Sequence, residues 1–191
     1  MTKKILLLLA DGFEEVEAVG THDVLKRLGC QVVTAGVEKR EVKSSASLCI
    51  VADVTLDSLL GDEALLSSFD AVVLPGGLPG ATNLRDSGKV KKLVTDFCGK
   101  GRIVAAICAA PAALSSFGIL EGKTVTGYPG CERLSSVSSL AFTGRRTERS
   151  GNIVTGKGPG VSFEFAGEIG RALGIDEEKI AAVFNGMFVK A

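Results

Sequence analysis

The stretch ILLLLADGFEEVEAVGTHDVLKRLGCQVVTA, residues 5–35, decides the fold of this chain. Its first part, residues 5–9, is an uninterrupted apolar run, which is typical of a strand buried on both faces of a parallel sheet. We expect a helix over residues 14–28, ended by Gly29, and a second strand over residues 31–35. A strand, a helix and a second strand in this order predict a parallel sheet.

The same alternation continues through the rest of the chain. Further strands are expected at residues 48–52, 71–74, 103–107 and 124–126, with a hairpin formed by residues 145–148 and 153–155. Helices are expected at residues 90–98, from Pro111 to about Phe117, and at residues 162–173 and 177–188. No repeat, linker or low-complexity tract interrupts this pattern. Residues 1–191 therefore predict one α/β domain, a doubly wound sandwich whose mostly parallel sheet carries helices on both faces.

Composition excludes several classes of partner. The chain has 22 basic and 22 acidic residues, no Trp and a single Tyr. A nucleic-acid binder usually shows a basic excess, so nucleic acid is not expected as a specific partner. The apolar run at the N-terminus has six residues and then meets Asp11, which is too short and too acidic for a signal peptide. With no stretch long enough to span a membrane, we expect a cytoplasmic protein.

The five cysteines predict neither a metal site nor a disulfide framework. They are unclustered, odd in number and without a C-x-x-C motif: Cys30, Cys49, Cys98, Cys108 and Cys131. The first three lie at strands or on a core-facing helical stripe, which indicates structural roles. Cys131 follows Pro129-Gly130 in a loop and is expected to be exposed. A redox role for Cys49 or Cys131 stays open.

Three loops that end strands carry the unusual residues. They are Asp11–Glu17, Pro75–Gly77 and Cys108–Pro111. Parallel strands place such loops on one rim of the sheet, where ligands bind in open α/β folds. The glycine-rich residues 156–160 lack the GKS or GKT ending of a phosphate-binding loop, so we interpret them as a tight strand-to-helix connection.

Cys108 is the most informative residue in these loops. It stands between a buried strand and a helix that has Pro111 in its first turn, an arrangement similar to a nucleophile elbow. A helix N-terminus favours the thiolate and lowers the pKa of cysteines to about 3.5–7.5. The N–H groups of Gly77 and Ala109 would then form an oxyanion pocket. The alternative reading is a small buried apolar side chain, the usual environment of a free cysteine.

A thiolate nucleophile normally needs a proton acceptor. The single histidine, His22, lies inside the first helix, more than a turn beyond the strand end, and is interpreted as structural. Glu14 and Glu15 lie where that helix begins, where acidic residues are favoured by the helix dipole. Glu17 differs because it lies on a largely apolar turn. Buried there, its carboxyl would be protonated and would hydrogen-bond the Cys108 thiolate.

Four segments together resemble the ThiJ/PfpI superfamily, and within it the Parkinson disease protein 7 branch with its bacterial ThiJ-like relatives. They are ADGFEEVEA (10–18), VVLPGG (72–77), IVAAICAAP (103–111) and GKGPGVSFEFA (156–166), and they span nearly the whole chain in order. The resemblance implies a flavodoxin-like sandwich, a readily oxidised Cys108 and a protonated Glu17. It also implies an oxyanion and substrate-binding set: Gly76, Gly77, Ala109, Tyr128 and Pro159.

The resemblance further implies an activity without a cofactor. Members of the branch are described as converting methylglyoxal or glyoxal to hydroxy acids, as repairing early glycation adducts, and as redox sensors with chaperone-like protection. Two readings therefore stay open: a glyoxalase or deglycase, and a redox-responsive protein whose Cys108 is oxidised to a sulfinate without turnover. Ala109 replaces the histidine that follows the nucleophile in the peptidase-like branch, so a protease is not expected. Some relatives carry a histidine in the loop after residues 124–126, where this chain reads Gly127-Tyr128-Pro129, so the resemblance does not imply a histidine-assisted mechanism.

The resemblance also implies a homodimer. We expect the first helix and neighbouring strands to form the interface, because the small residues Ala18 and Gly20 would allow close approach of two helices.

Overall fold

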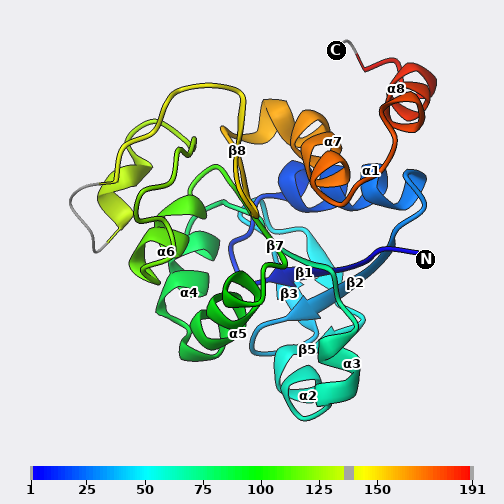
Figure 1. Cartoon of the computed structure of the whole chain (residues 1–191). Coiled ribbons are helices and arrows are strands. Elements are labelled where there is room, and N and C mark those ends of the chain that lie inside the picture. Colours follow the sequence, from blue (N-terminus) through cyan, green and yellow to red (C-terminus); the bar gives the residue numbers. More distant parts are fainter. Residues whose placement is uncertain (1, 136–139, 190–191) are drawn as a thin grey trace.

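The computed structural model describes residues 2–135 and 140–189 (Figure 1). The strands are β1 Lys4–Leu9, β2 Gln31–Gly36, β3 Glu41–Lys43, β4 Cys49–Val51, β5 Val54–Thr55, β6 Ala71–Leu74, β7 Ile103–Ile107, β8 Thr147–Ser150 and β9 Ile153–Gly156. The α-helices are α1 Thr21–Arg27, α2 Leu56–Leu60, α3 Glu63–Ser67, α4 Gly80–Asp86, α5 Gly88–Gly99, α6 Pro111–Ser116, α7 Ser162–Ala172 and α8 Glu177–Gly186. A π-helical turn, Val16–Gly20, precedes α1, and two short 3₁₀ turns are Cys131–Leu134 and Pro159–Val161.

Seven strands form one sheet in the order β5-β2-β1-β6-β7-β9-β8. All neighbouring pairs are parallel except β8 with β9, which form an antiparallel hairpin at one edge. The central five strands have the order of the flavodoxin-like fold, in which the second strand lies outside the first and the later strands follow on the other side. The predicted doubly wound, flavodoxin-like sandwich is confirmed.

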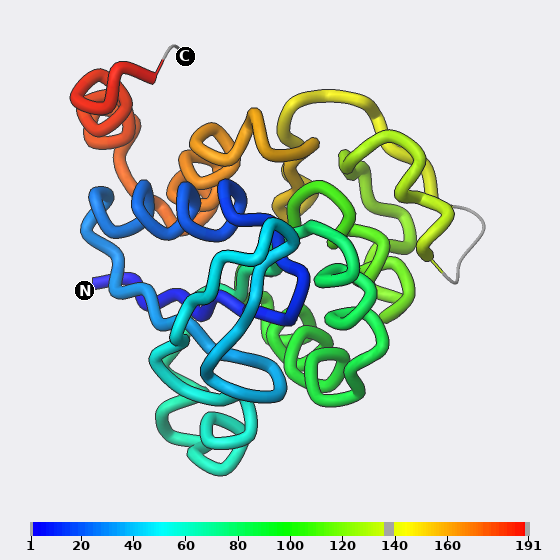
Figure 2. The backbone as a smooth tube through the Cα atoms, turned by 180° about the vertical axis from the view of Figure 1, so that it is seen from behind, coloured from blue at the N-terminus to red at the C-terminus, as the bar shows by residue number. Residues whose placement is uncertain are grey.

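Alternate side chains of β1 show why both faces of the sheet are covered. Leu7 and Leu9 belong to a buried cluster with residues of α1, α7 and α8. Leu6 and Leu8 point the other way, into a cluster with residues of α5 and α6. These two helices lie on the opposite side of the sheet from α1 and α7 (Figure 1). A strand that buries both faces reads as a continuous apolar run, which is the pattern of residues 5–9. Figure 2 shows α8 (red) at the outer margin of the helical layer formed by α1 and α7.

Some predicted elements differ in the structure. The helix expected over residues 14–28 is divided into the π-helical turn and α1. The strand expected at residues 48–52 is present as β4, but it pairs with β3 in a separate hairpin and not with the main sheet.

Residues 124–126 form no strand, so that prediction was wrong. The backbone N–H of Thr126 donates to the Thr155 hydroxyl at 2.9 Å, and its own hydroxyl donates to the carbonyl of Arg145 at 2.6 Å. Side-chain hydrogen bonds therefore take the place of a strand ladder.

Ala18 and Gly20, the small residues of the expected helix contact, differ in exposure. Ala18 is buried inside the chain, whereas Gly20 is half-buried, and a Cβ at Gly20 would lie 3.1 Å from the Phe163 ring of α7. Ala18 therefore packs within the chain, and a role of Gly20 in a dimer contact stays a prediction. Among the described residues, no helix combines the length and apolar character that a membrane span requires.

Candidate active site

The three predicted loops meet at the carboxyl edge of the sheet, beyond the adjacent strands β1, β6 and β7. The backbone N–H of Glu14 donates to the carbonyl of Gly76 at 3.1 Å, which joins the first loop to the second. The backbone N–H of Gly76 donates to Oε2 of Glu17 at 2.8 Å. The prediction that the three loops share one rim is confirmed.

Cys108 lies at the sharp turn that the sequence predicts. Its φ is 64°, a left-handed conformation that costs free energy in a residue with a side chain. Two hydrogen bonds hold this turn: Cys108 N–H donates to the carbonyl of Gly156 at 2.9 Å, and Tyr128 N–H donates to the carbonyl of Cys108 at 2.8 Å. The side chain is 8% exposed. Neighbouring backbone therefore maintains the strained conformation at a nearly buried thiol.

Gly76 allows the second loop to pass directly over this thiol. A Cβ placed on Gly76 would lie 2.7 Å from Cβ of Cys108 and 2.8 Å from Oε2 of Glu17. Both distances are shorter than side chains tolerate, so only glycine permits this approach. The N–H of Gly76 is already bonded to Glu17, so this predicted binding residue has no amide left for a substrate oxyanion.

The three glutamates of the first loop have separate tasks. The carboxylate of Glu14 accepts the backbone N–H of Glu17 at 2.7 Å, and that of Glu15 accepts the Ser44 hydroxyl and the backbone N–H of Ala46. Glu14 thus supports the start of the helix, as predicted, whereas Glu15 fixes the turn between β3 and β4. Glu17 is fully buried.

A π-helical turn directs Glu17 inward. Val16 and Val19, its neighbours in residues 16–20, are about half exposed, at 49% and 46%. The turn therefore buries a carboxyl while it leaves valines at the surface. Such turns are rare and occur often at functional sites. Apolar periodicity alone does not reveal them.

Burial raises the pKa of Glu17 to about 7, while hydrogen bonds with Cys108 and Gly76 lower it. Oε2 accepts the Gly76 N–H, and Oε1 is buried with no nitrogen or oxygen partner among the described residues. A protonated Glu17 carboxyl would be able to donate to the sulfur of Cys108, with which it is hydrogen-bonded. The surroundings therefore favour a protonated carboxyl near neutral pH.

Burial also raises the pKa of the Cys108 thiol, and the charge of an ionised Glu17 raises it further. The expected lowering of the Cys108 pKa by a helix N-terminus was therefore wrong. Helix α6 has only six residues, and the N–H groups of Ala110 and Ala112 are bonded to the carbonyls of Ile107 and Ala109. Little helix dipole remains to act on the sulfur. The Gly77 N–H is the group that lowers the thiol pKa.

The pKa of the Cys108 thiol therefore depends on the charge of Glu17, so the two groups titrate as a coupled pair. When Glu17 is protonated, its repulsion of the thiolate disappears. This coupling could not be read from residue spacing.

Gly77 is held by the loops around it. It has a φ of 84°, and a Cβ there would lie 2.5 Å from the backbone nitrogen of Glu14. Its N–H hydrogen-bonds the Cys108 sulfur. No backbone or side-chain acceptor for the Ala109 N–H is found in the described ranges. The predicted oxyanion donors thus lie at the residues that flank the thiol, and their role stays a prediction.

Tyr128 and Pro159 lie on the outer side of the site. The ring of Tyr128 is half exposed and lies over Gly158, where an added Cβ would be 3.3 Å from Cδ2. Pro159 follows Gly158 and lines a hollow of 340 Å³ together with Val16, the residue before Glu17. Tyr128 is thus hydrogen-bonded to Cys108 through the backbone. Pro159 lies at the surface hollow that Val16 also lines. Their contribution to substrate binding stays a prediction.

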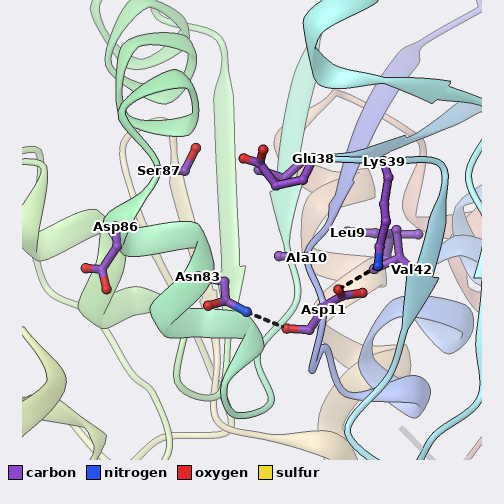
Figure 3. A pocket seen from close by; sticks show the side chains of 10 residues that line it. Leu9, Ala10, Asp11, Glu38, Lys39, Val42, Asn83, Asp86 and Ser87 are labelled. Atoms are coloured by element: carbon purple, nitrogen blue, oxygen red, sulfur yellow. Dashed lines mark hydrogen bonds and ion pairs between the residues drawn. The ribbon is translucent and has the colours of Figure 1, made fainter.

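Another hollow of 340 Å³ lies at the end of β1, between β2 and α4 (Figure 3). Neither Cys108 nor Glu17 lines it. Its charged groups are largely paired: Asp11 lies 3.1 Å from Nζ of Lys39, and Asn83 donates to the backbone carbonyl of Asp11 at 2.7 Å. This hollow is therefore separate from the thiol. Within residues 2–135 and 140–189, no three His, Cys, Asp or Glu side chains gather as a metal site would require.

Sequence reasoning missed Gly156, whose carbonyl fixes the Cys108 turn. A Cβ there would lie 3.0 Å from Cγ1 of Ile107 and 3.1 Å from Phe165. The residue ends β9, which pairs with β7 next to the thiol, so the strand order would have been the signal.

Comparison with known proteins agrees with this geometry. Residues 3–172 match the DJ-1/PfpI family. The chain is 40% identical over 166 residues to the Parkinson disease protein 7 homolog of Danio rerio, covering 86% of each chain. It is 32% identical over 162 residues to the glutathione-independent glyoxalase DJR-1.2 of Caenorhabditis elegans, covering 85% of this chain and 83% of that one. Oxidised DJ-1 of Toxoplasma gondii superposes with a TM-score of 0.89 at 30% identity, and both chains are fully covered. The chain therefore belongs to the DJ-1/PfpI family.

Proposed function

We propose that this chain is a cysteine-dependent glyoxalase or deglycase that acts on methylglyoxal, glyoxal or early glycation adducts, with Cys108 as nucleophile and Glu17 as proton carrier. One observation supports this most: a fully buried carboxyl with a pKa of about 7 is hydrogen-bonded to a thiol on a strained turn. A group that titrates near the operating pH is the best general acid and base. Buried thiols with only packing roles do not need such a partner.

The chemistry balances within the substrate. The Cys108 sulfur bonds to the aldehyde carbon of methylglyoxal, and Gly77 and Ala109 donate to the oxyanion, which becomes a hemithioacetal hydroxyl. Glu17 takes the proton from that carbon and returns one to the adjacent ketone carbon, while the proton of the hemithioacetal hydroxyl passes to the ketone oxygen, which leaves a thioester. Water cleaves the thioester to lactate and the free thiol. The aldehyde carbon is oxidised and the ketone carbon reduced, so no external electron carrier enters the balance.

The relative from Caenorhabditis elegans named a glutathione-independent glyoxalase supports this choice of substrate class. In our proposal the Cys108 sulfur forms the hemithioacetal that a free thiol such as glutathione would otherwise form. Small dicarbonyls suit a nucleophile that is only 8% exposed, because bulky substrates would be hindered from reaching its sulfur.

The test is lactate formation from methylglyoxal in the absence of glutathione. Cys108→Ala should abolish turnover, and Glu17→Gln should lower it by about a hundredfold, the usual contribution of a general acid or base. Cys49→Ala is the matched control, because Cys49 is exposed on β4, in a hairpin outside the main sheet. If Cys108→Ala and Cys49→Ala turn over equally, the proposal is wrong.

A second candidate is a redox-responsive, chaperone-like protein in which Cys108 is oxidised to a sulfinate without turnover. The Gly77 N–H and the Glu17 carboxyl would hydrogen-bond sulfinate oxygens as well as they would an oxyanion. The similar Toxoplasma gondii structure is of an oxidised protein. Absence of lactate from a protein whose Cys108 is readily oxidised by peroxide would favour this candidate.

We also propose that the chain forms a homodimer. Val16, Val19 and Val51 are large apolar side chains that are about half exposed near the first helix and β4. Their burial against a second copy would remove this apolar surface from water. Sedimentation at micromolar concentration should give twice the 19.7 kDa of one chain, and a monomer would contradict the proposal.

A further inference from the structure

A second thiol, that of Cys131, lies on a turn whose backbone is hydrogen-bonded to the backbone of Cys108. In Tyr128-Pro129-Gly130-Cys131, the Cys131 N–H donates to the carbonyl of Tyr128 at 3.0 Å. Proline in the second place and Gly130 at φ 88° in the third make this a type II turn, which brings its first and fourth Cα atoms within about 7 Å. Tyr128 N–H donates in turn to the carbonyl of Cys108 at 2.8 Å. Two hydrogen bonds therefore connect the two cysteines.

The side chains are also neighbours. Cys131 is half-buried and packs against the apolar cluster that contains Cys108 and Ala109. The charge of Cys131 raises the pKa of the Cys108 thiol, and the charge of Glu17 raises the pKa of both thiols. The two cysteines and Glu17 therefore form one group at the same edge of the sheet. The proposed turnover uses only Cys108 and Glu17 of this group.

We propose that Cys131 is a resolving cysteine, which forms an intramolecular disulfide with Cys108 after a hydroperoxide has oxidised Cys108. This rests on the proposed role of Cys108 as the reactive thiol. A disulfide requires Cα atoms about 4.4–6.8 Å apart. Residues 123–130 lie in neither helix nor strand, so closing the bond shifts a turn and breaks no strand pairing.

The step balances in atoms and electrons. The Cys108 sulfur attacks one peroxide oxygen, the O–O bond breaks, and the leaving oxygen takes a proton from Glu17. This gives a sulfenic acid at Cys108. The Cys131 thiolate then attacks the Cys108 sulfur, and hydroxide leaves and is protonated to water. Two thiols are oxidised to one disulfide, and hydrogen peroxide is reduced to two waters.

The consequence is reversibility. Without a resolving thiol, a second peroxide converts the sulfenic acid to a sulfinate, which ordinary thiols do not reduce. A disulfide is reduced by thiol exchange. Cys131 therefore changes a permanent oxidation of the nucleophile into a temporary one.

Tryptic mapping without reduction tests the proposal. The chain is cleaved after Arg102, Lys123 and Arg133, which puts Cys108 alone in residues 103–123 and Cys131 alone in residues 124–133. After treatment with two equivalents of hydrogen peroxide and alkylation of remaining thiols, the wild-type protein should give these two peptides joined. Cys131→Ser should give instead the Cys108 peptide with two added oxygens. Cys49→Ser, the matched control, should behave like the wild type.

A mixture of ¹⁵N-labelled and unlabelled protein separates links within a chain from links between chains. A wild-type protein that accumulates Cys108 sulfinate as fast as Cys131→Ser, with no joined peptides, would overturn the proposal, and so would joined peptides of mixed label. Both results leave the proposed turnover intact. If Cys108 stays unoxidised while other cysteines react, the reactive role of Cys108 itself is wrong, and both proposals fail.

Discussion

Replacing Gly76 by alanine introduces a methyl carbon between the two groups proposed to carry the chemistry. The new Cβ would lie 2.7 Å from Cβ of Cys108, 2.8 Å from Oε2 of Glu17 and 2.8 Å from the carbonyl oxygen of Ile107. Carbon atoms in contact prefer about 3.5–4.0 Å, so each neighbour must withdraw by about 1 Å. One neighbour is backbone of β7, which cannot rotate away. The loop or the two functional side chains must therefore move.

The size of this displacement gives the expected losses of stability and of turnover. Overpacking a close-packed interior costs about 1–3 kcal/mol in the free energy of unfolding, and each kcal/mol lowers Tm by about 2–4 °C at this chain length. A misplacement of about 1 Å at reacting groups lowers turnover by about a hundredfold. Gly76→Ala should therefore lose lactate formation from methylglyoxal while it remains folded, as measured by circular dichroism.

Gly99→Ala is the matched control. Gly99 ends helix α5, has an ordinary φ, and an added Cβ would meet no atom within 4 Å. This variant should keep full turnover and an equal or higher Tm, because alanine favours a helix over glycine by about 0.5–1 kcal/mol. If Gly76→Ala keeps the turnover and Tm of Gly99→Ala, the close approach of the loop to Cys108 and Glu17 is refuted.

Three further predictions follow from the charged groups. Because burial raises the pKa of Glu17 from 4.5 to about 7, the folded protein holds a proton that the unfolded chain releases, so the free energy of unfolding falls as pH rises between these values. In urea titrations, the free energy of unfolding of Glu17→Gln should exceed that of the wild type by on the order of 3 kcal/mol at about pH 8 and should match it near pH 4. Parallel profiles of unfolding free energy against pH for the two proteins would contradict this. Glu15→Ala removes the acceptor of the Ser44 hydroxyl and should speed amide hydrogen exchange in the turn between β3 and β4, with no change in the β1 amides. Arg146→Ala breaks an exposed ion pair with Glu164 and should lower the free energy of unfolding, measured by thermal unfolding, by at most about 1 kcal/mol. A larger loss of stability would contradict the assignment of this pair as a weak surface contact.

The central strands could be predicted because they are buried on both faces. Residues 5–9, 71–74 and 103–107 are apolar throughout, and each is a strand of the main sheet. The short elements could not be predicted in the same way. β5 has only two residues, and β3 has three, so neither is long enough to show a period.

The candidate site was predictable in position more than in electrostatics. The turn at Cys108 and the meeting of three loops follow from Pro111 and from the parallel order of the strands. The pKa of the thiol does not, because it depends on how deeply Cys108 is buried and on the charge of Glu17 across the site. The π-helical turn that buries Glu17 equally depends on packing, and its sequence shows no signature.

Gly76 and Gly77 also bear on how this site can change over generations or under engineering. Main chain rests against main chain or against the reacting side chains at both positions, so a new side chain there collides whatever its chemistry. Under the proposed function, single substitutions at these two glycines are expected to abolish turnover before they alter substrate preference. Tyr128 differs, because its ring is half exposed and lies over Gly158. New substrate preferences are therefore expected to arise by single mutations at Tyr128, while the two glycines stay fixed.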